Sequence, residues 1–509
     1  MTIQTRTLNQ RTGSALKWNY FGMAVRSLSS LLLGIVLARI LGPKPFGVVA
    51  ITAVLIGFCN LLADFGFNAT IVQRETLNEE DIQFVFFSQM LSGVFMALAC
   101  FLGAGLIASL FHNQDVAPVI RVLSLTFPLQ AIGQTASGLL RRKLAFRTIQ
   151  IAQIASYIVY FSTGIPLAAA GFGVWALVVA QLAQVSVNSV IAYSMAPHSL
   201  LFSFRVNRSI LAYGVKVLGS SFASWSVSNL DNAFVGRVFG VVALGLYSRA
   251  FQLTVTPILA VASGLQSVLM SAYARAQNRK DVLRRVYLAS IAVMTVATFP
   301  FYAAVAVVPS TVILTLYGCA WAGAVPLFVP LALAMPLYAQ LCLAVPLLWG
   351  TGGIGRDLKV QYATAFVAIA VFATTSHISV VCLAWGVLAV YVFRFIWMTR
   401  QMVLYLEITW VEVAAAMRGG AVLALLAAPS VWLVDRVMVR NGLPAVVRLV
   451  TDFAVALFIT LIPLAMAPDA VLGPHCSFIL SQIRSMMPRV LQRFVPNPLG
   501  VLPAMPGRQ

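Results

Sequence analysis

The feature that most constrains the fold is a series of long apolar segments separated by short polar ones. Windows of about 19 residues identify about fourteen such segments. Each approaches the roughly 20 residues that a helix needs to cross a bilayer, where only helices and closed barrels can pair all their backbone groups. The predicted spans are residues 18–41, 47–70, 83–110, 117–138, 149–169, 172–194, 210–235, 241–268, 286–308, 323–349, 359–377, 378–400, 411–434 and 446–467. The sequence predicts an all-α polytopic membrane protein of about 14 transmembrane helices.

Composition supports this class. The 509 residues are 60% hydrophobic and 9% charged, whereas about 25% of the residues of a soluble domain are charged. The net charge of +20 is compatible with nucleic-acid binding, but the basic residues lie mostly in short segments between apolar runs. There they act as topology signals and contact anionic lipid. We therefore expect membrane lipid as a partner, and no nucleic acid.

The basic residues also predict the orientation of the spans. With the N-terminus in the cytoplasm, most of them fall on the cytoplasmic side, as the positive-inside rule requires. The cytoplasmic set is Arg6, Arg11, Lys17, Arg141, Arg142, Lys143, Arg147, Arg205, Arg208, Arg275, Arg279, Lys280, Arg284, Arg285, Arg356 and Lys359. Both termini are then cytoplasmic.

An internal repeat links the two halves of the chain. Three residues at the outer end of the first span recur at a constant offset of 198 positions. They are Arg39, Gly42 and Gly47, followed by Arg237, Gly240 and Gly245. Because the first and seventh spans run in the same direction, the offset predicts two parallel six-helix lobes related by an axis along the membrane normal. The predicted parts are a cytoplasmic N-terminus (1–17), an N-lobe (18–208), a C-lobe (209–402), two extra helices (403–468) and a basic amphipathic cytoplasmic tail (469–509).

Cations within spans are the first candidates for a binding site. An arginine inside a span costs at least about 2.5–3.5 kcal/mol and usually faces a bundle interior or a watery cavity. Converging cations suit a phosphate or pyrophosphate, for which arginine supplies bidentate donors. The candidates are Arg26, Lys216, Arg249 and Arg394. Arg39, Arg237 and Arg394 lie close enough to span ends that snorkelling to the interface is the competing explanation.

Acids and amides supply the remaining candidates. Asp64 and Asp231 lie in apolar surroundings. With Arg39 and Arg237, the latter near Asp231, they are expected to form salt bridges between the lobes or alternatively to couple transport to protons. Polar side chains that share one face of the fifth and sixth spans line a sugar pathway or form interhelical hydrogen bonds. These are Gln150, Gln153, Gln181, Gln184 and Asn188.

Catalytic chemistry has little support in the sequence. No nucleotide-binding GxxxxGK[ST] motif occurs, and the six cysteines lack metal-ligand spacing. We expect no metal, no cofactor and no enzyme activity.

Five segments occur in a distinctive order: LARILGPKPFG (37–47), LADFGFNATIVQRE (62–75), LLRRKLAFRTI (139–149), LGLYSRAFQL (244–253) and YGCAWAGAVPLFVPLAL (317–333). In this order they resemble segments of the Wzx-type polysaccharide transporters of the multidrug/oligosaccharidyl-lipid/polysaccharide exporter (MOP) superfamily. The resemblance covers about residues 14–400 and does not extend to the tail. It implies two six-helix bundles around a central cavity and alternating access.

The resemblance also implies a function. The protein is expected to be a flippase that moves undecaprenyl-diphosphate-linked oligosaccharide repeat units across the bacterial inner membrane for O-antigen or exopolysaccharide synthesis. Glycosyltransferases and a polymerase of the same pathway are its possible partners. Two alternatives remain at this point: a multidrug exporter of the same superfamily, and a membrane polymerase or ligase, which usually has a large outer loop.

Overall fold

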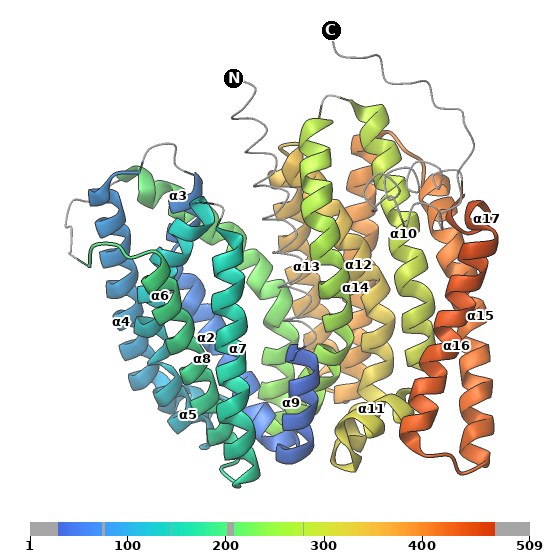
Figure 1. The fold of residues 1–509 in the computed structure, drawn as a ribbon, viewed down its shortest axis with the longest axis horizontal. Helices are drawn as coiled ribbons and strands as arrows, with labels where there is room; N and C mark the ends of the chain where they lie inside the picture. Colours follow the sequence, from blue (N-terminus) through green and yellow to red (C-terminus); the bar gives the residue numbers. More distant parts are fainter. Residues whose placement is uncertain (1–28, 74–76, 144, 201–207, 278, 474–509) are drawn as a thin grey trace. The chain divides into compact units, whose positions relative to one another are not determined.

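The described part of the chain belongs to the all-α class. The structure is a computed structural model that describes residues 29–73, 77–143, 145–200, 208–277 and 279–473. It is 89% helical and contains no strand within these ranges. Twelve of its helices are long and apolar enough to cross a membrane, which confirms the predicted class (Figure 1).

The chain forms two compact units. The first comprises residues up to Ser267 together with Pro309–Met335 and Ile354–Trp397; the second comprises Val268–Val308, Pro336–Gly353 and the chain from Met398. The helices wholly within the first unit are Ser29–Leu41, α2 (Pro43–Asp64), α3 (Phe67–Gln73), α4 (Glu79–Leu110), α5 (Val116–Leu123), α6 (Thr126–Arg142), α7 (Phe146–Ala169), α8 (Val174–Met195), α11 (Pro309–Tyr317), the 3₁₀ helix η1 (Cys319–Ala324) and α13 (Ile354–Thr375). Those wholly within the second are α10 (Lys280–Val307), α15 (Trp410–Arg440), α16 (Ala445–Met466) and α17 (Pro468–Leu472). Residues of both units belong to α9 (Arg208–Arg275), α12 (Val325–Gly350) and α14 (Val380–Leu406).

The predicted spans map onto these helices with several differences. The second span, 47–70, is divided between α2 and α3, and the fourth, 117–138, between α5 and α6. The first span begins outside the described residues, which leaves the short helix Ser29–Leu41. The seventh and eighth spans both fall in α9, whose 68 residues correspond to about 100 Å of helix at 1.5 Å per residue. That length exceeds a bilayer several-fold, and non-helical dihedrals at Gly240 divide α9 there. The count of fourteen stays a prediction, whereas the separation of α13 from α14 at residues 376–379 is confirmed.

The repeat in the sequence has a counterpart in the backbone. Gly42 has φ 71° and ψ −176°, and Gly240 has φ 82° and ψ −178°. This conformation is essentially restricted to glycine, because a Cβ atom clashes with the backbone. Gly42 separates Ser29–Leu41 from α2, and Gly240 divides α9. The same residue type therefore breaks the helix in the same way at both copies.

The two breaks contact each other reciprocally. A Cβ atom at Gly47 would lie 1.8 Å from the carbonyl oxygen of Val241. A Cβ atom at Gly245 would lie 2.1 Å from the carbonyl oxygen of Pro43. Since Val241 also follows Pro43 by 198 positions, the two contacts are equivalent, like those across a two-fold interface. This is the local relation that the repeat predicts; the two parallel six-helix lobes remain a prediction.

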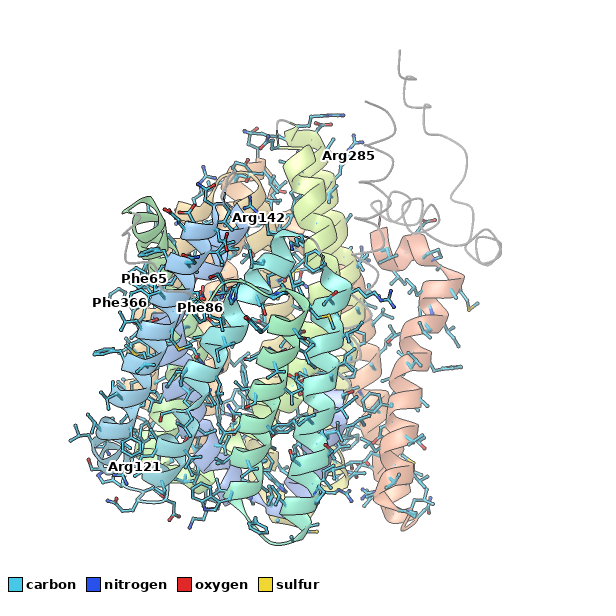
Figure 2. All side chains as sticks on the ribbon, turned by 60° about the vertical axis from the view of Figure 1, so that its left-hand side comes forward. Phe65, Phe86, Arg121, Arg142, Arg285 and Phe366 are labelled. Atoms are coloured by element: carbon cyan, nitrogen blue, oxygen red, sulfur yellow. The ribbon has the colours of Figure 1, made fainter. Side chains whose placement is uncertain are left out.

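Apolar side chains cover the outer surface of the first unit. Leu98, Leu102 and Leu106 follow one another at four-residue spacing on α4 and are 56%, 71% and 76% exposed. Phe366 on α13 also projects away from the helices (Figure 2). Large apolar patches of this kind are rare on soluble monomers but suit contact with lipid chains.

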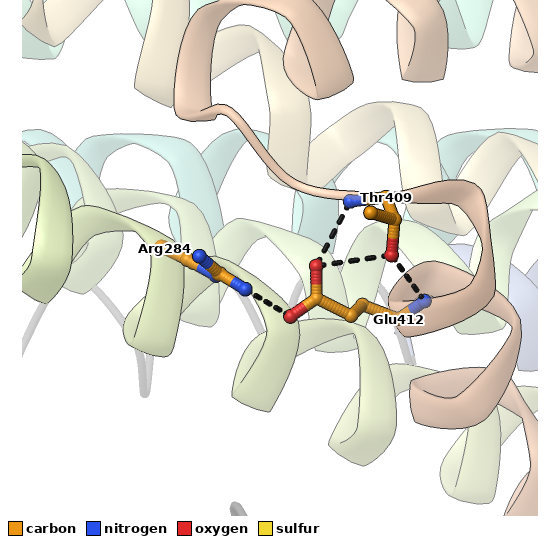
Figure 3. Close-up of polar contacts among 3 residues, drawn as sticks. All are labelled: Arg284, Thr409 and Glu412. Atoms are coloured by element: carbon orange, nitrogen blue, oxygen red, sulfur yellow. Dashed lines mark hydrogen bonds and ion pairs between the residues drawn. The ribbon is translucent and has the colours of Figure 1, made fainter.

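In the second unit, α10 packs along α15. Gly420 permits close approach, since a Cβ atom there would lie 2.5 Å from the backbone of Thr295. At the start of α15, Thr409 accepts a hydrogen bond from the backbone N–H of Glu412, whose carboxylate also pairs with Arg284 of α10 (Figure 3). This capping box satisfies free N–H groups at the helix N-terminus. The predicted amphipathic tail lies mostly outside the described residues.

Candidate functional site

A polar cavity of about 450 Å³ lies within the first unit, between α3, α6, α7 and α8. Its size is typical of pockets for small molecules. Seven amide side chains line it: Asn68 from α3, Gln130 and Gln134 from α6, Gln153 from α7, and Gln181, Gln184 and Asn188 from α8. We call this cavity the amide pocket. The described residues of its lining also include one cation, Arg141, and no carboxylate.

Four of the five amides predicted to line a sugar pathway are thus brought together. The fifth, Gln150, is only 4% exposed and does not line the pocket. Sequence reasoning missed Gln130 and Gln134, although the signal was present. These two residues, with Ser137 and Arg141, follow at i, i+4, i+7 and i+11, which places them on one helix face.

Close packing of α6 on α8 forms one wall of the pocket. A Cβ atom at Gly133 would lie 2.7 Å from the Cα and Oγ atoms of Ser189, so only glycine permits this approach without displacement. Both residues line the pocket. The amides of the two helices therefore face the same space.

A hydrogen-bond network supports the pocket beside α3. Asn68, which lines the pocket, donates to Oδ1 of Asp64 at 2.6 Å. Gln89 of α4 donates to the same oxygen at 3.3 Å and accepts from the Thr135 hydroxyl at 2.6 Å. Asp64 was predicted as a salt-bridge or coupling residue. In the structure Asp64 accepts hydrogen bonds from amide side chains of α3 and α4. The bond from Asn68 holds that pocket-lining side chain in position.

The predicted cations have different environments. The guanidinium carbon of Arg249 lies 4.1 Å from the ring centroid of Phe46, which is a cation–π contact, and its Nε is buried without a hydrogen-bond partner. No carboxylate of the described residues pairs with Arg249. The Nε of Arg394 is likewise buried and unpartnered. Arg26 and the side chain of Lys216 lie outside the described residues.

Arg39 and Arg237 instead anchor the two helix breaks. Arg39 donates from Nε to the carbonyl oxygen of Leu316 at 2.7 Å and also to that of Thr315. These carbonyls lie at the C-terminal end of α11, where a cation is favourable. Nη1 of Arg237 lies 2.8 Å from Nδ1 of His112. Both arginines therefore have protein partners.

The Asp231–Arg237 pairing considered from the sequence is not formed. Asp231 is buried and accepts a hydrogen bond of 2.6 Å from the Tyr247 hydroxyl, and a second from the backbone N–H of Asn232. Because Tyr247 follows the break at Gly240, this bond joins the two parts of α9. The physical reason is local: Tyr247 supplies a buried donor without the cost of burying a second charge.

Comparisons with known proteins agree with this architecture. The sequence profile of a family described as "Polysaccharide biosynthesis protein" matches residues 36–326. The chain is 26% identical over 341 residues to the succinoglycan biosynthesis transport protein ExoT of Rhizobium meliloti, covering 65% of this chain and 67% of ExoT. It is 25% identical over 374 residues to the lipopolysaccharide biosynthesis protein WzxC of Escherichia coli, covering 71% and 75%.

Two solved structures resemble the fold. The lipid II flippase MurJ, in an inward closed conformation, superposes with a TM-score of 0.70 at 11% identity, covering 90% of this chain and 98% of MurJ. An inward-facing multidrug resistance MATE family transporter of the MOP superfamily gives a TM-score of 0.55 at 20% identity, covering 75% and 95%. At these identities the likeness establishes the transporter fold alone.

Proposed function

Because the chain belongs to the family of polysaccharide biosynthesis proteins, we propose that it is a flippase for lipid-linked oligosaccharides. It moves repeat units carried on undecaprenyl diphosphate from the inner to the outer leaflet of the bacterial cytoplasmic membrane by alternating access. Two relatives whose names place them in polysaccharide export or synthesis support this function. The protein transports its substrate without changing it chemically, and both of its termini are cytoplasmic.

The amide pocket is the observation that carries the proposal. Carboxamides both donate and accept hydrogen bonds, which matches the hydroxyl groups of a sugar. None of the described residues that line the pocket is a carboxylate, so these residues offer no counter-charge to a cationic drug. This difference favours an oligosaccharide over the substrate of a multidrug exporter.

Cations near the pocket and elsewhere in the spans bind the diphosphate in this proposal. Arg141 lines the amide pocket at the last turn of α6, and Arg249 has no carboxylate partner among the described residues. Arg26, Lys216 and Arg394 are the further candidates. Two phosphate groups need several donors, and charge-assisted hydrogen bonds from arginine are stronger than neutral ones.

The test is to replace pocket amides in a strain that lacks the native protein. Gln181→Ala and Gln184→Ala each remove a neutral hydrogen bond of about 0.5–1.5 kcal/mol, which lowers transport about two- to tenfold. Surface polysaccharide should fall while lipid-linked repeat units accumulate on the inner leaflet. Ser194→Ala is a matched control, because Ser194 lies on α8, is not among the described residues that line the pocket, and donates to the Ile191 carbonyl one turn away on its own helix. Normal export by a variant lacking both glutamines, at equal membrane abundance, would refute the proposal.

A further inference from the structure

Helix α7 lines two cavities of different chemistry. Its first half contributes Gln153 and Ser156 to the amide pocket. From Ile154 onward it contributes residues, Phe161 and Ile165 among them, to a separate groove of about 450 Å³. Tyr157 lines both. The polar cavity and the groove therefore adjoin at this tyrosine.

The groove is apolar and open to its surroundings. It lies between α7 and the helix Ser29–Leu41, from which Leu33 lines it. Among the described residues that line it, none is charged, and the polar side-chain groups are two serine hydroxyls and the Tyr157 hydroxyl. Ile158 at its edge is 62% exposed. An apolar surface with this exposure suits a hydrocarbon chain.

We propose that this groove binds the polyprenyl chain of the same molecule whose oligosaccharide head occupies the amide pocket. The inference rests on the proposed function and adds the site of the lipid part. A lipid-linked sugar must pass from polar to apolar surroundings along its length. Along α7 the lining of the groove begins at Ile154, the lining of the amide pocket ends at Tyr157, and the groove alone continues beyond it; from Gln153 to Ile165 the helix rises about 18 Å, at 1.5 Å per residue.

The order of the two cavities along α7 fits a lipid arriving from the inner leaflet. The amide pocket includes Arg141 and Ile149, at the end of α6 and the start of α7, where the basic residues predict the cytoplasmic side. The groove extends the other way along α7, as far as Pro166. A head group held at the first end thus leaves its chain pointing toward the bilayer interior. Tyr157 marks the change, and its ring stacks with that of Phe161 at 6.3 Å.

The experiment places a photo-crosslinking amino acid at position 158 of the full-length protein in native membranes. The probe is undecaprenyl-diphosphate-linked repeat unit labelled in its sugar. The matched control is the same amino acid at position 102, since Leu102 is 71% exposed on α4 and lines neither cavity. We expect roughly tenfold more labelled lipid at position 158, the ratio that about 1.4 kcal/mol of preference produces. Equal labelling at the two positions, or capture of phospholipid alone at position 158, would overturn the inference.

A second arm separates this inference from the proposed function. Gln181→Ala and Gln184→Ala are added to the protein with the crosslinker at position 158. If one molecule spans both cavities, these changes reduce labelling at position 158 together with export. If export depends on the two glutamines but position 158 captures only phospholipid, the groove is not the site of the polyprenyl chain, and the flippase proposal still stands. Export that is independent of them refutes the flippase site itself.

Discussion

Replacing Gly47 with alanine tests whether the two helix breaks form one contact. In the structure a Cβ atom at Gly47 would lie 1.8 Å from the Val241 carbonyl oxygen, 2.7 Å from its carbonyl carbon and 2.8 Å from its Cγ1. The first two atoms belong to the backbone, so a rotamer change cannot relieve the overlap. Either α2 or the second part of α9 must move.

The magnitude follows from that displacement. Carbon–oxygen contacts of this kind lie at about 3.3 Å or more, so the two backbones must separate by about 1.5 Å. Inserting a methyl group into a well-packed interior costs about 1–3 kcal/mol, and a clash with backbone belongs at the upper end. Gly245→Ala should cost a similar amount, because its Cβ atom would lie 2.1 Å from the Pro43 carbonyl oxygen. Because a single movement of the two backbones apart relieves both overlaps, the double variant should lose less stability than the sum of the losses of the two single variants.

Thermal denaturation of the purified full-length protein in detergent measures these costs, with the monodisperse fraction as the readout. A loss of about 3 kcal/mol lowers the midpoint by roughly 6–12 °C, on the scale of domains of 150–250 residues. Gly103→Ala is the control, because a Cβ atom there has no neighbour within 4 Å and alanine favours a helix over glycine by about 0.8–1 kcal/mol. If Gly47→Ala and Gly245→Ala denature like Gly103→Ala, or if their costs simply add, the reciprocal contact does not exist.

Two further predictions concern pH and topology. Burial lowers the pKa of His198, which lies against the rings of Phe86 and Tyr193 after the end of α8. Its contribution to stability is therefore fully present above the ordinary histidine pKa of about 6.5 and is lost as the pH falls through its lowered value. His198→Phe should reduce the fall in denaturation midpoint between about pH 7.5 and pH 5.5, and an unchanged fall would contradict this role. Reporter fusions after Arg147 and near Asn441 should report the cytoplasm and the outside, respectively; the reverse pattern would contradict the predicted orientation.

The fold was largely predictable because membrane spans depend on local composition. Runs of about 20 apolar residues must pair their own backbone groups, so they form helices whatever their neighbours are. The repeat was also visible, since an arginine and two glycines kept one offset of 198 residues. The contacts that these glycines make could not be predicted from the sequence. The contact of Gly47 with Val241 joins residues 194 positions apart, and hydrophobic periodicity carries no information about such a pair.

The candidate site was predictable in part for a similar reason. Gln181, Gln184 and Asn188 share a face by helix geometry alone, but periodicity does not say what that face meets. The partners of Asp64 and Asp231 depend on tertiary packing: one binds amides of α3 and α4, and the other binds a tyrosine beyond the break in α9. Residue spacing favoured the nearby Arg237 as the partner of Asp231 instead.

The arginines considered above in the first unit fall into two classes, and the difference bears on function. Arg39 and Arg237 have protein partners that anchor the helix breaks, and this fully accounts for their presence. Arg249 has an aromatic ring over its guanidinium and a buried Nε without a hydrogen-bond partner. Leaving such a donor unpaired costs about 1–3 kcal/mol, more for a charged group. The cation–π contact with Phe46 offsets only part of this free-energy cost. A protein that used Arg249 only to pack its helices would be more stable with an apolar residue there, so the cost favours a role in which an anionic ligand completes the site.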